Sequence, residues 1–334
     1  MVHWTRAAHA RQQRGLATLT VASFLAAGLI ATAADPATVP SAGLIVFTGA
    51  NNGQIYSVSP RGTGLKQLTT PASLGSSAAT ADSPALSPDG RRVVFIVNSG
   101  STQQLWMMNA DGGKPHVLPL DAAPSALIHP TWSPDGKKIA FSGQDLPRNE
   151  QWLIYVVNAD GSNMQTITQQ FATYPAWSPD GKWIAFDSMD NPAVHDPTND
   201  PGGIFVVHPD GTNLHRLTPE DTGPEQYPLW SRDGKRLLYS RLPPDWQSQT
   251  IYAQPLYEVL TTGSGVRQLT TGAFNDFPGA FSPDGKQLVF QREHDPRSLN
   301  FHLYVMNSDG SHVHALVPQM LGRSPSWGGQ PTAR

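Results

Sequence analysis

Short apolar runs separated by turn residues recur along the chain from about residue 44 onwards. Lys137–Phe141, for example, reads Lys-Lys-Ile-Ala-Phe, and Ile154–Val157 reads Ile-Tyr-Val-Val. Because side chains alternate along a strand, Ile139 and Phe141 would share one face. Thirty Gly and thirty Pro residues stand between such runs rather than in one low-complexity block. The pattern predicts an all-β protein made of many short strands joined by turns.

The tetrapeptide Ser-Pro-Asp-Gly punctuates these runs at nearly regular intervals. It recurs, once as Ser-Arg-Asp-Gly, with spacings of 46, 45, 53 and 51 residues, starting at Ser87, Ser133, Ser178, Ser231 and Ser282. Proline fixes φ at the second turn position, Asp suits the third, and Gly takes the left-handed fourth. Each repeat therefore predicts a tight hairpin between two strands.

A second half-unit follows each of these hairpins, as in Ile154–Thr168. Its turn reads Asn-x-Asp-Gly or His-Pro-Asp-Gly, beginning at Asn109, Asn158, His208 and Asn307. An aromatic residue stands six positions before the Gly of this turn, at Tyr56, Trp106, Tyr155, Phe205, Tyr257 and Tyr304. Four antiparallel strands repeated every 45 to 53 residues are typical of one propeller blade.

The two ends of the chain determine the number of blades. Five first halves and six second halves are present, because Leu44–Thr69 lacks a preceding inner strand. Pro325-Ser326-Trp327 supplies the missing strand at the far end. We therefore predict a six-bladed β-propeller of four-stranded antiparallel blades over residues 43–328, with a tail at 329–334. The C-terminal strand would complete the first blade and remove free sheet edges.

The repeat Pro-x-Trp-Ser-Pro-Asp-Gly-Lys-x-Ile-Ala-Phe resembles that of TolB and TolB-like periplasmic propellers. Similar repeats occur in propellers of prolyl-oligopeptidase relatives and in oligogalacturonate lyases. The resemblance to TolB implies a binding scaffold whose partner is a protein, since the TolB propeller docks the peptidoglycan-associated lipoprotein. TolB carries an α/β domain ahead of its propeller, whereas only residues 34–42 stand here between the predicted leader and the first strand.

Residues 1–33 have the layout of a signal peptide. Three arginines precede the uncharged apolar run Gly15–Ile30, and Ala31-Thr32-Ala33 offers a cleavage pattern. A spanning helix needs about 20 apolar residues, which favours cleavage over a retained signal-anchor. We therefore expect a short linker at 34–42, a periplasmic or secreted protein, and no membrane insertion after cleavage.

The charge and the cysteine content limit the classes of binding partner and the chemistry that we expect. Without residues 1–33, 20 basic residues remain against 26 acidic ones, so nucleic acid and anionic membranes are not expected partners. The sequence has no Cys and therefore neither disulfides nor thiol chemistry. We expect a monomer that binds a protein or peptide, with an envelope lipoprotein or a glycan as candidates.

Candidate binding residues lie where the chain leads into each innermost strand, at the mouth of the central channel. This long-loop face should also carry three variable loops, Asp190–Gly203, Arg241–Pro255 and Gln291–Asn300, whereas the opposite face carries uniform tight turns. A ring of aromatic and polar groups suits recognition of a peptide, a protein loop or a sugar. The candidates are Asp82, His129, Tyr174, Gln226, Tyr227, Trp246, Asp276, Phe277 and Arg323.

Enzyme motifs are sparse in this sequence. Gly-x-Ser-x-Gly, His-Glu-x-x-His and EF-hand loops are not present. We therefore expect no catalytic residue, no cofactor and no metal. The alternative is a metal-dependent carbohydrate-binding or polysaccharide lyase-type propeller, because the lyase relatives hold a metal with histidines near their channel. The histidines that could converge there are His129, His195, His294 and His302.

Overall fold

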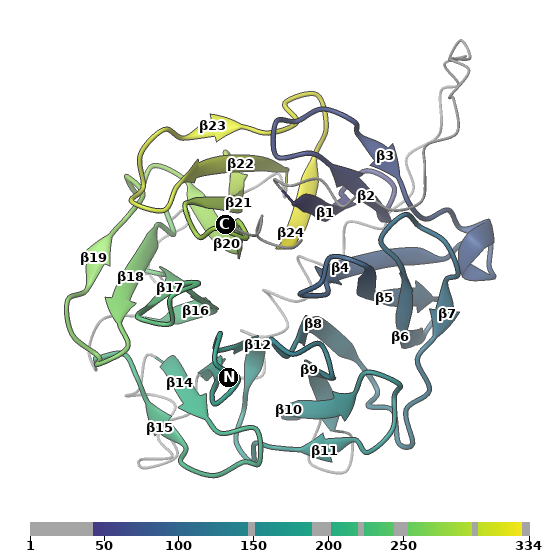
Figure 1. Cartoon of the computed structure of the whole chain (residues 1–334), viewed down its shortest axis with the longest axis horizontal. Helices are drawn as coiled ribbons and strands as arrows, with labels where there is room; N and C mark the ends of the chain where they lie inside the picture. The colour runs from purple at the N-terminus through teal and green to yellow at the C-terminus, as the bar shows by residue number, and fades with distance from the viewer. Residues whose placement is uncertain are drawn as a thin grey trace.

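A ring of six sheets around a central channel forms the molecule in the computed structural model (Figure 1). The structure describes residues 43–145, 151–188, 202–219, 224–243, 253–295 and 300–328. Within these residues each sheet contains four strands, and every neighbouring pair within a sheet is antiparallel. The six-bladed, all-β propeller predicted from the repeats is therefore confirmed.

The first three blades follow the order expected from the two half-units of the repeat. Blade 1 consists of β24 (Gly322–Gly328), β1 (Leu44–Gly49), β2 (Gln54–Val58) and β3 (Lys66–Gln67). After the 3-10 turn η2 (Ala72–Leu74), blade 2 consists of β4 (Thr80–Leu86), β5 (Arg92–Ser99), β6 (Thr102–Asn109) and β7 (His116–Val117). Blade 3 consists of β8 (Leu127–Trp132), β9 (Lys138–Asp145), β10 (Gln151–Asn158) and β11 (Gln165–Thr166).

The other three blades repeat this arrangement with the innermost strand first. Blade 4 consists of β12 (Thr173–Trp177), β13 (Ile184–Ser188), β14 (Gly203–Val207) and β15 (His215–Arg216). Blade 5 consists of β16 (Glu225–Trp230), β17 (Arg236–Arg241), β18 (Leu256–Leu260) and β19 (Arg267–Gln268). Blade 6 consists of β20 (Asn275–Phe281), β21 (Gln287–Glu293), β22 (Phe301–Asn307) and β23 (His314–Ala315).

The C-terminal strand β24 closes the ring by pairing with β1, the first strand of the chain. Ile45 is the register partner of Trp327, and Val46 is the partner of Ser326. Trp327 is 3% exposed and packs in one cluster with Ile45 and with Val305 of blade 6. The Pro-Ser-Trp motif near the C-terminus therefore completes blade 1, as predicted, and Figure 1 shows β24 lying beside β1.

The Ser-Pro-Asp-Gly turns owe their shape to hydrogen bonds within the motif. Ser133 Oγ donates to Asp135 Oδ1 at 2.6 Å, and the same carboxylate oxygen accepts the Lys137 N–H at 3.0 Å. Gly136 takes a φ of 68°, which a residue with a Cβ would adopt at a cost. The Ser133 hydrogen bond holds the pKa of Asp135 below its usual value. All five such turns share this Ser–Asp bond, so the sequence motif determines the hairpin locally.

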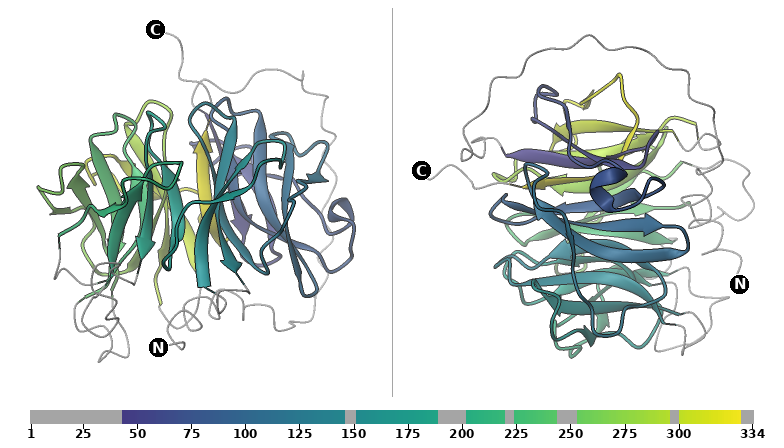
Figure 2. Two further views of the ribbon diagram at one scale, coloured as in Figure 1. Left: turned by 90° about the horizontal axis from the view of Figure 1, so that it is seen from below. Right: turned by 90° about the vertical axis from the view of Figure 1, so that its right-hand side faces the viewer.

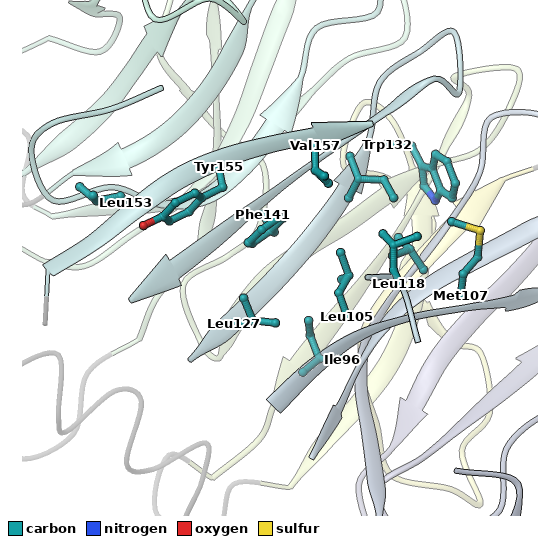
Figure 3. Packing of buried hydrophobic residues seen from close by; sticks show 12 residues of the cluster. Ile96, Leu105, Met107, Leu118, Leu127, Trp132, Phe141, Leu153, Tyr155 and Val157 are labelled. Atoms are coloured by element: carbon teal, nitrogen blue, oxygen red, sulfur yellow. The ribbon is translucent and has the colours of Figure 1, made fainter. Parts of the chain in front are cut away.

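Aromatic side chains of the second and third strands fill the blades. Phe141 of β9 is fully buried and stacks on Tyr155 of β10, with ring centroids 5.6 Å apart. Figure 3 shows these rings packed with residues of blade 2, among them Ile96 and Leu105, in one cluster that joins the two blades. Burying each ring contributes about 2–3 kcal/mol. Because the clusters join neighbouring blades, each blade depends on the blades beside it.

Deleting residues 323–334 should lower the melting temperature by on the order of 10 °C, because β1 loses its partner strand and an edge is exposed. Thermal unfolding followed by circular dichroism measures the change. Deleting only residues 329–334, which lie beyond β24, is the matched control and should leave the melting temperature unchanged. Equal melting of the two truncations would contradict the closure.

Candidate functional site

A bulge with a left-handed residue interrupts the innermost strand in five of the six blades. The left-handed residue always precedes a proline, and its φ lies between 50° and 58°, at Ser83, His129, Tyr174, Tyr227 and Ser324. Such backbone is strained for a residue other than Gly, and a bulge redirects the side chain it carries. Three of these residues are among the predicted channel-mouth candidates, so the bulges position them.

The N–H group of most of these left-handed residues is hydrogen-bonded to a side chain at the same end of the channel. Three of the acceptors come from the second strand of the preceding blade, one residue after its core aromatic. The pairs are Tyr174 N–H to Ser142 Oγ at 3.1 Å, Tyr227 N–H to the Asp187 carboxyl, Ser324 N–H to Gln291 Oε1 at 2.6 Å, and Ser83 N–H to Asp82 Oδ1 at 2.7 Å. Hydrogen bonds between blades therefore support strained backbone within them.

Blade 6 departs from this scheme. The register of β20 shifts between Pro278 and Ala280, two residues later than in the other blades, and Phe277 is not left-handed. A Cβ on Gly279 would lie 2.8 Å from the Val289 carbonyl oxygen and 2.5 Å from Pro325, so only Gly fits at this shifted bulge. Phe277 consequently reaches the channel in a different backbone conformation from its counterparts.

Four aromatic side chains from blades 3 to 6 contact one another across the channel. The ring centroids lie 4.3 Å apart for His129 and Tyr174, 4.0 Å for Tyr174 and Tyr227, and 5.1 Å for Tyr227 and Phe277. Tyr174 is 7% exposed, while the other three remain partly exposed. Burial, followed by the neighbouring Tyr227, raises the pKa of the Tyr174 hydroxyl well above its usual value, so it stays protonated. The cluster therefore has a buried, uncharged Tyr174 at its centre and three partly exposed aromatic side chains around it.

Blades 1 and 2 contribute an ion pair to the same ring of positions. Arg323 Nη2 lies 2.9 Å from Asp82 Oδ2, and both side chains are about one fifth exposed. Thr48 Oγ1 of β1 donates to Asp82 Oδ1 at 3.1 Å. The ring thus consists of an aromatic arc, the four aromatic side chains from blades 3 to 6, and a polar arc, the Asp82–Arg323 pair from blades 1 and 2.

Asp187 of β13 lies beneath the aromatic arc and is 2% exposed. Its Oδ2 accepts the Thr173 hydroxyl at 2.8 Å, and the carboxyl also accepts the Tyr227 N–H. Burial raises the pKa of Asp187 to about 8 in spite of these hydrogen bonds. A largely neutral carboxyl at pH 7 therefore supports the strained backbone of Tyr227.

The other three candidates predicted from the sequence belong neither to the aromatic cluster nor to the Asp82–Arg323 pair. Asp276 is 1% exposed and forms a bidentate pair with Arg292, at 2.6 Å and 2.9 Å, so it is a buried structural ion pair. Gln226 Oε1 accepts a hydrogen bond from Gln254 Nε2 at 3.2 Å. Trp246 lies outside the described residues, as do most of the two variable loops Asp190–Gly203 and Arg241–Pro255.

Sequence reasoning missed the acceptors that support the ring, although the sequence carries a signal for them. The residue after the core aromatic of the second strand is polar in five blades and Ile96 in the sixth, at Thr48, Ser142, Asp187, Ser240 and Gln291. These residues are at most 8% exposed. A polar residue at the same step of an otherwise apolar strand indicates a buried hydrogen-bonding role. Phe301, whose ring lies 5.8 Å from Phe277, had no such signal.

Two histidines of blade 6 lie close together in the described part of the chain. The His294 and His302 rings lie 5.8 Å apart, and His294 Nε2 is 2.8 Å from the Tyr304 hydroxyl. Over the described residues, no group of three or more His, Cys, Asp or Glu side chains is arranged to hold a metal ion. His195 lies outside them. None of the helices in the described part of the chain has the length and apolarity needed to cross a membrane.

Closure by the C-terminal strand and the repeated Ser-Pro-Asp-Gly hairpins define the class of protein: a six-bladed propeller with a TolB-type repeat. The family model for the TolB beta propeller domain matches residues 120–331, and that for the lipoprotein LpqB beta-propeller domain matches residues 58–140. The chain belongs to the TolB beta-propeller family.

Solved structures of similar proteins share this fold. TolB from Acinetobacter baumannii superimposes with a TM-score of 0.66 and 20% identity over 86% of this chain and 67% of its own. The putative TolB from Agrobacterium tumefaciens gives a TM-score of 0.63 and 21% identity over 84% of this chain and 90% of its own. At these identities the likeness establishes the fold alone.

The sequence match to a curated relative is local. The Tol-Pal system protein TolB of Bordetella avium is 40% identical over 50 residues, which are 15% of this chain and 11% of that protein. The aligned segment therefore spans about a tenth of the length of that relative.

The raised pKa of Asp187 predicts a stability that falls as pH rises. Between the unfolded pKa, near 4, and the folded pKa, about 8, only the folded state holds this proton. Stability should therefore decrease by on the order of 1 kcal/mol per pH unit on account of this group. Asp187→Asn, which stays neutral, should remove much of that slope and should melt several degrees above the parent protein at about pH 8.5.

Melting curves at about pH 5.5 and about pH 8.5 provide the measurement. Asp309→Asn is the control, because the Ser311 hydroxyl lowers the pKa of Asp309 and its stability contribution is lost only in acid. An Asp187→Asn protein with the parental pH slope would show that Asp187 is ionised in the folded state.

Proposed function

We propose that this chain is a noncatalytic scaffold of the cell envelope that binds a protein or peptide at its channel mouth, on the long-loop face. The observation that carries the proposal is the contact of His129, Tyr174, Tyr227 and Phe277 across four blades. Left-handed backbone carries His129, Tyr174 and Tyr227, and side chains of the preceding blade support it at the two tyrosines. Strain of this kind at one ring of positions is typical of a site rather than of packing alone.

The chemistry of the ring suits a protein surface. Tyrosine, other aromatics and arginine dominate the energetics of protein interfaces, because each combines a large apolar area with a polar group. The arc of rings offers an apolar patch, and the Asp82–Arg323 pair beside it offers one charge of each sign. A partner loop that inserts an apolar residue and pairs its polar atoms with Asp82 or Arg323 would match both arcs.

The relatives support a protein partner from the envelope. A matching relative is a Tol-Pal system protein, and a second family model describes the propeller of a lipoprotein. The partner class that we propose is an envelope lipoprotein, on the resemblance of the repeat to that of TolB. Export is part of this proposal and is supported by the signal-peptide layout of residues 1–33, which lie outside the described structure. The mature protein would act in the periplasm or outside the cell.

Site-specific photocrosslinking tests the binding face. Replacing Phe277 with benzoylphenylalanine should yield a discrete protein adduct on irradiation in the native envelope, because this ring is partly exposed at the channel. The same probe at Leu260, which is 42% exposed at the end of β18 on the tight-turn face, is the matched control. Adducts at Leu260 but not at Phe277 would place the functional face on the other side.

The captured partner then allows a quantitative test. Phe277→Ala should weaken its binding about 30-fold, which corresponds to about 2 kcal/mol for an interface anchor. Asp309→Ala, on the opposite face, should bind with the affinity of the parent protein, and calorimetric titration compares the three. Tyr227 is less suitable for this purpose, because its ring packs on Tyr174 and its loss would also lower stability.

N-terminal sequencing of the protein recovered from the periplasm or the medium tests export. We expect the chain to begin at Ala34, after the Ala31-Thr32-Ala33 pattern. Recovery of an intact Met1 in a membrane fraction would indicate a signal-anchor and would contradict the proposed release.

A further inference from the structure

A pocket of about 510 Å³ opens on the tight-turn face between blades 4 and 5. Its lining includes Trp183, Val206 and Leu217 of blade 4 or its turns, and Trp230 and Asp233 of blade 5. This face was expected to carry only uniform turns, and that expectation does not hold between these two blades. The pocket is separate from the channel-mouth ring, which lies at the opposite end of the innermost strands.

One position of the repeat explains why the pocket lies here. The second residue after the Gly of each Ser-Pro/Arg-Asp-Gly turn is Arg92, Lys138, Trp183, Arg236 or Gln287. Between blades 2 and 3 the Arg92 guanidinium lies over the Trp132 ring, 4.6 Å from its centroid. Its Nη2 also donates to the Gly136 carbonyl oxygen at 3.1 Å. The space between these two blades thus receives a guanidinium from the protein itself.

The space between blades 4 and 5 has the same walls. Trp230 corresponds to Trp132, and the indole N–H of each donates to the equivalent carbonyl of the preceding blade, at 3.1 Å to Ala176 and at 3.0 Å to Ala85. Gly234, which corresponds to Gly136, lines the pocket. Proline Cδ lies 3.9 Å from the Cβ position of both glycines, from Pro179 and Pro88 respectively. The two spaces are therefore equivalent in the parts that contact a guanidinium.

Trp183 stands at the position of Arg92 but does not fill this space. Its ring packs on the His208 and His215 rings of its own blade, with centroid distances of 4.1 Å and 5.3 Å. The cation already at this pocket, Arg232, donates to the backbone carbonyls of blades 6 and 1 at Phe281, Ser282 and Trp327. The surface of Trp230 consequently faces a pocket instead of a guanidinium from the chain.

We propose that this pocket binds the guanidinium of an arginine side chain presented by a peptide or protein. The guanidinium would lie over Trp230 and donate to the Gly234 carbonyl, as Arg92 does over Trp132. Its methylene stem would contact Trp183, Val206 and Leu217.

Charges at the rim favour a cation. The carboxylates of Asp180 and Asp233 line the pocket, and hydrogen bonds from Ser178 and Ser231, the largest influence on each, lower their pKa values. Asp233 would face the bound guanidinium directly from the turn that carries Gly234. Arg232 also lines the pocket, but its guanidinium is directed at backbone carbonyl oxygens, and the Nζ of Lys182 lies 3.8 Å from Asp180 Oδ2 in an exposed pair. Exposed pairs of this kind contribute little, so Lys182 would yield to a ligand.

The first experiment detects the ligand directly at the two indoles. The full mature chain is labelled with 5-fluorotryptophan, and Trp183→Phe and Trp230→Phe assign the two fluorine resonances. Titration with N-acetyl-arginine amide should shift both resonances saturably, with a dissociation constant on the order of 1–10 mM for this small probe. N-acetyl-citrulline amide, which is neutral and of nearly equal shape, should bind at least about tenfold more weakly.

The decisive variant replaces Trp183 with Arg, the residue that blade 2 carries at the same position of the repeat. Trp183→Arg should fold, because blade 2 carries Arg at this position, and it should abolish the response of Trp230 to the probe. Lys138→Arg at the same position of blade 3 is the matched control and should keep the parental response. Spermidine distinguishes a general cation site from one for guanidinium.

Four results would overturn the proposal: no saturable shift at about 100 mM probe, equal binding of the citrulline amide, equal binding of spermidine, or a parental response from Trp183→Arg. None of these results bears on the channel mouth, so this proposal and the proposed function can fail separately.

Discussion

The fold depends on the pairing of β24 with β1, because this is the one contact that makes a linear array of blades into a ring. Every hydrophobic cluster of the propeller is shared between neighbouring blades, and the cluster of blades 6 and 1 includes Trp327 of the closing strand. In an open array, the terminal blades would expose both a sheet edge and an apolar face. Figure 2 shows the strands of the ring standing side by side, so each sheet covers the next.

Ring closure also explains how the channel tolerates strained backbone. A left-handed residue other than Gly costs about 1–3 kcal/mol, and five blades carry one in the innermost strand. The side chains that support these residues come largely from the preceding blade, as with Ser142 for Tyr174 and Gln291 for Ser324. Blade 6 tests this relation: Phe277 is not left-handed, and the hydroxyl of Ser240 has no hydrogen-bond partner among the described residues.

The two faces of the ring differ in how they depart from the repeat. At the channel mouth five blades carry Ser, His or Tyr at the same left-handed bulge position, so the side chains vary on a shared backbone. On the tight-turn face the hairpin turns are nearly constant, and a pocket lies between two blades where Trp183 stands at the position of Arg92. In the interior, Asp187 of blade 4 likewise stands where blade 3 has Ser142. Burial raises the pKa of the Asp187 carboxyl to about 8.

The sequence by itself determined the blades, their number and their closure, because hairpin turns and alternating strands depend on local residues such as Ser133, Asp135 and Gly136. It also indicated the channel-mouth positions, since they precede a proline at a fixed offset in every repeat. It did not determine which of them would be exposed: Asp276 became a buried partner of Arg292, whereas Tyr227 and Phe277 joined an aromatic arc. Only the tertiary structure decided which channel-mouth residues are exposed and where the pocket beside Trp230 lies. The channel mouth and the pocket are each formed by residues of neighbouring blades that lie about 50 positions apart in the sequence, and these residues meet only in the closed ring.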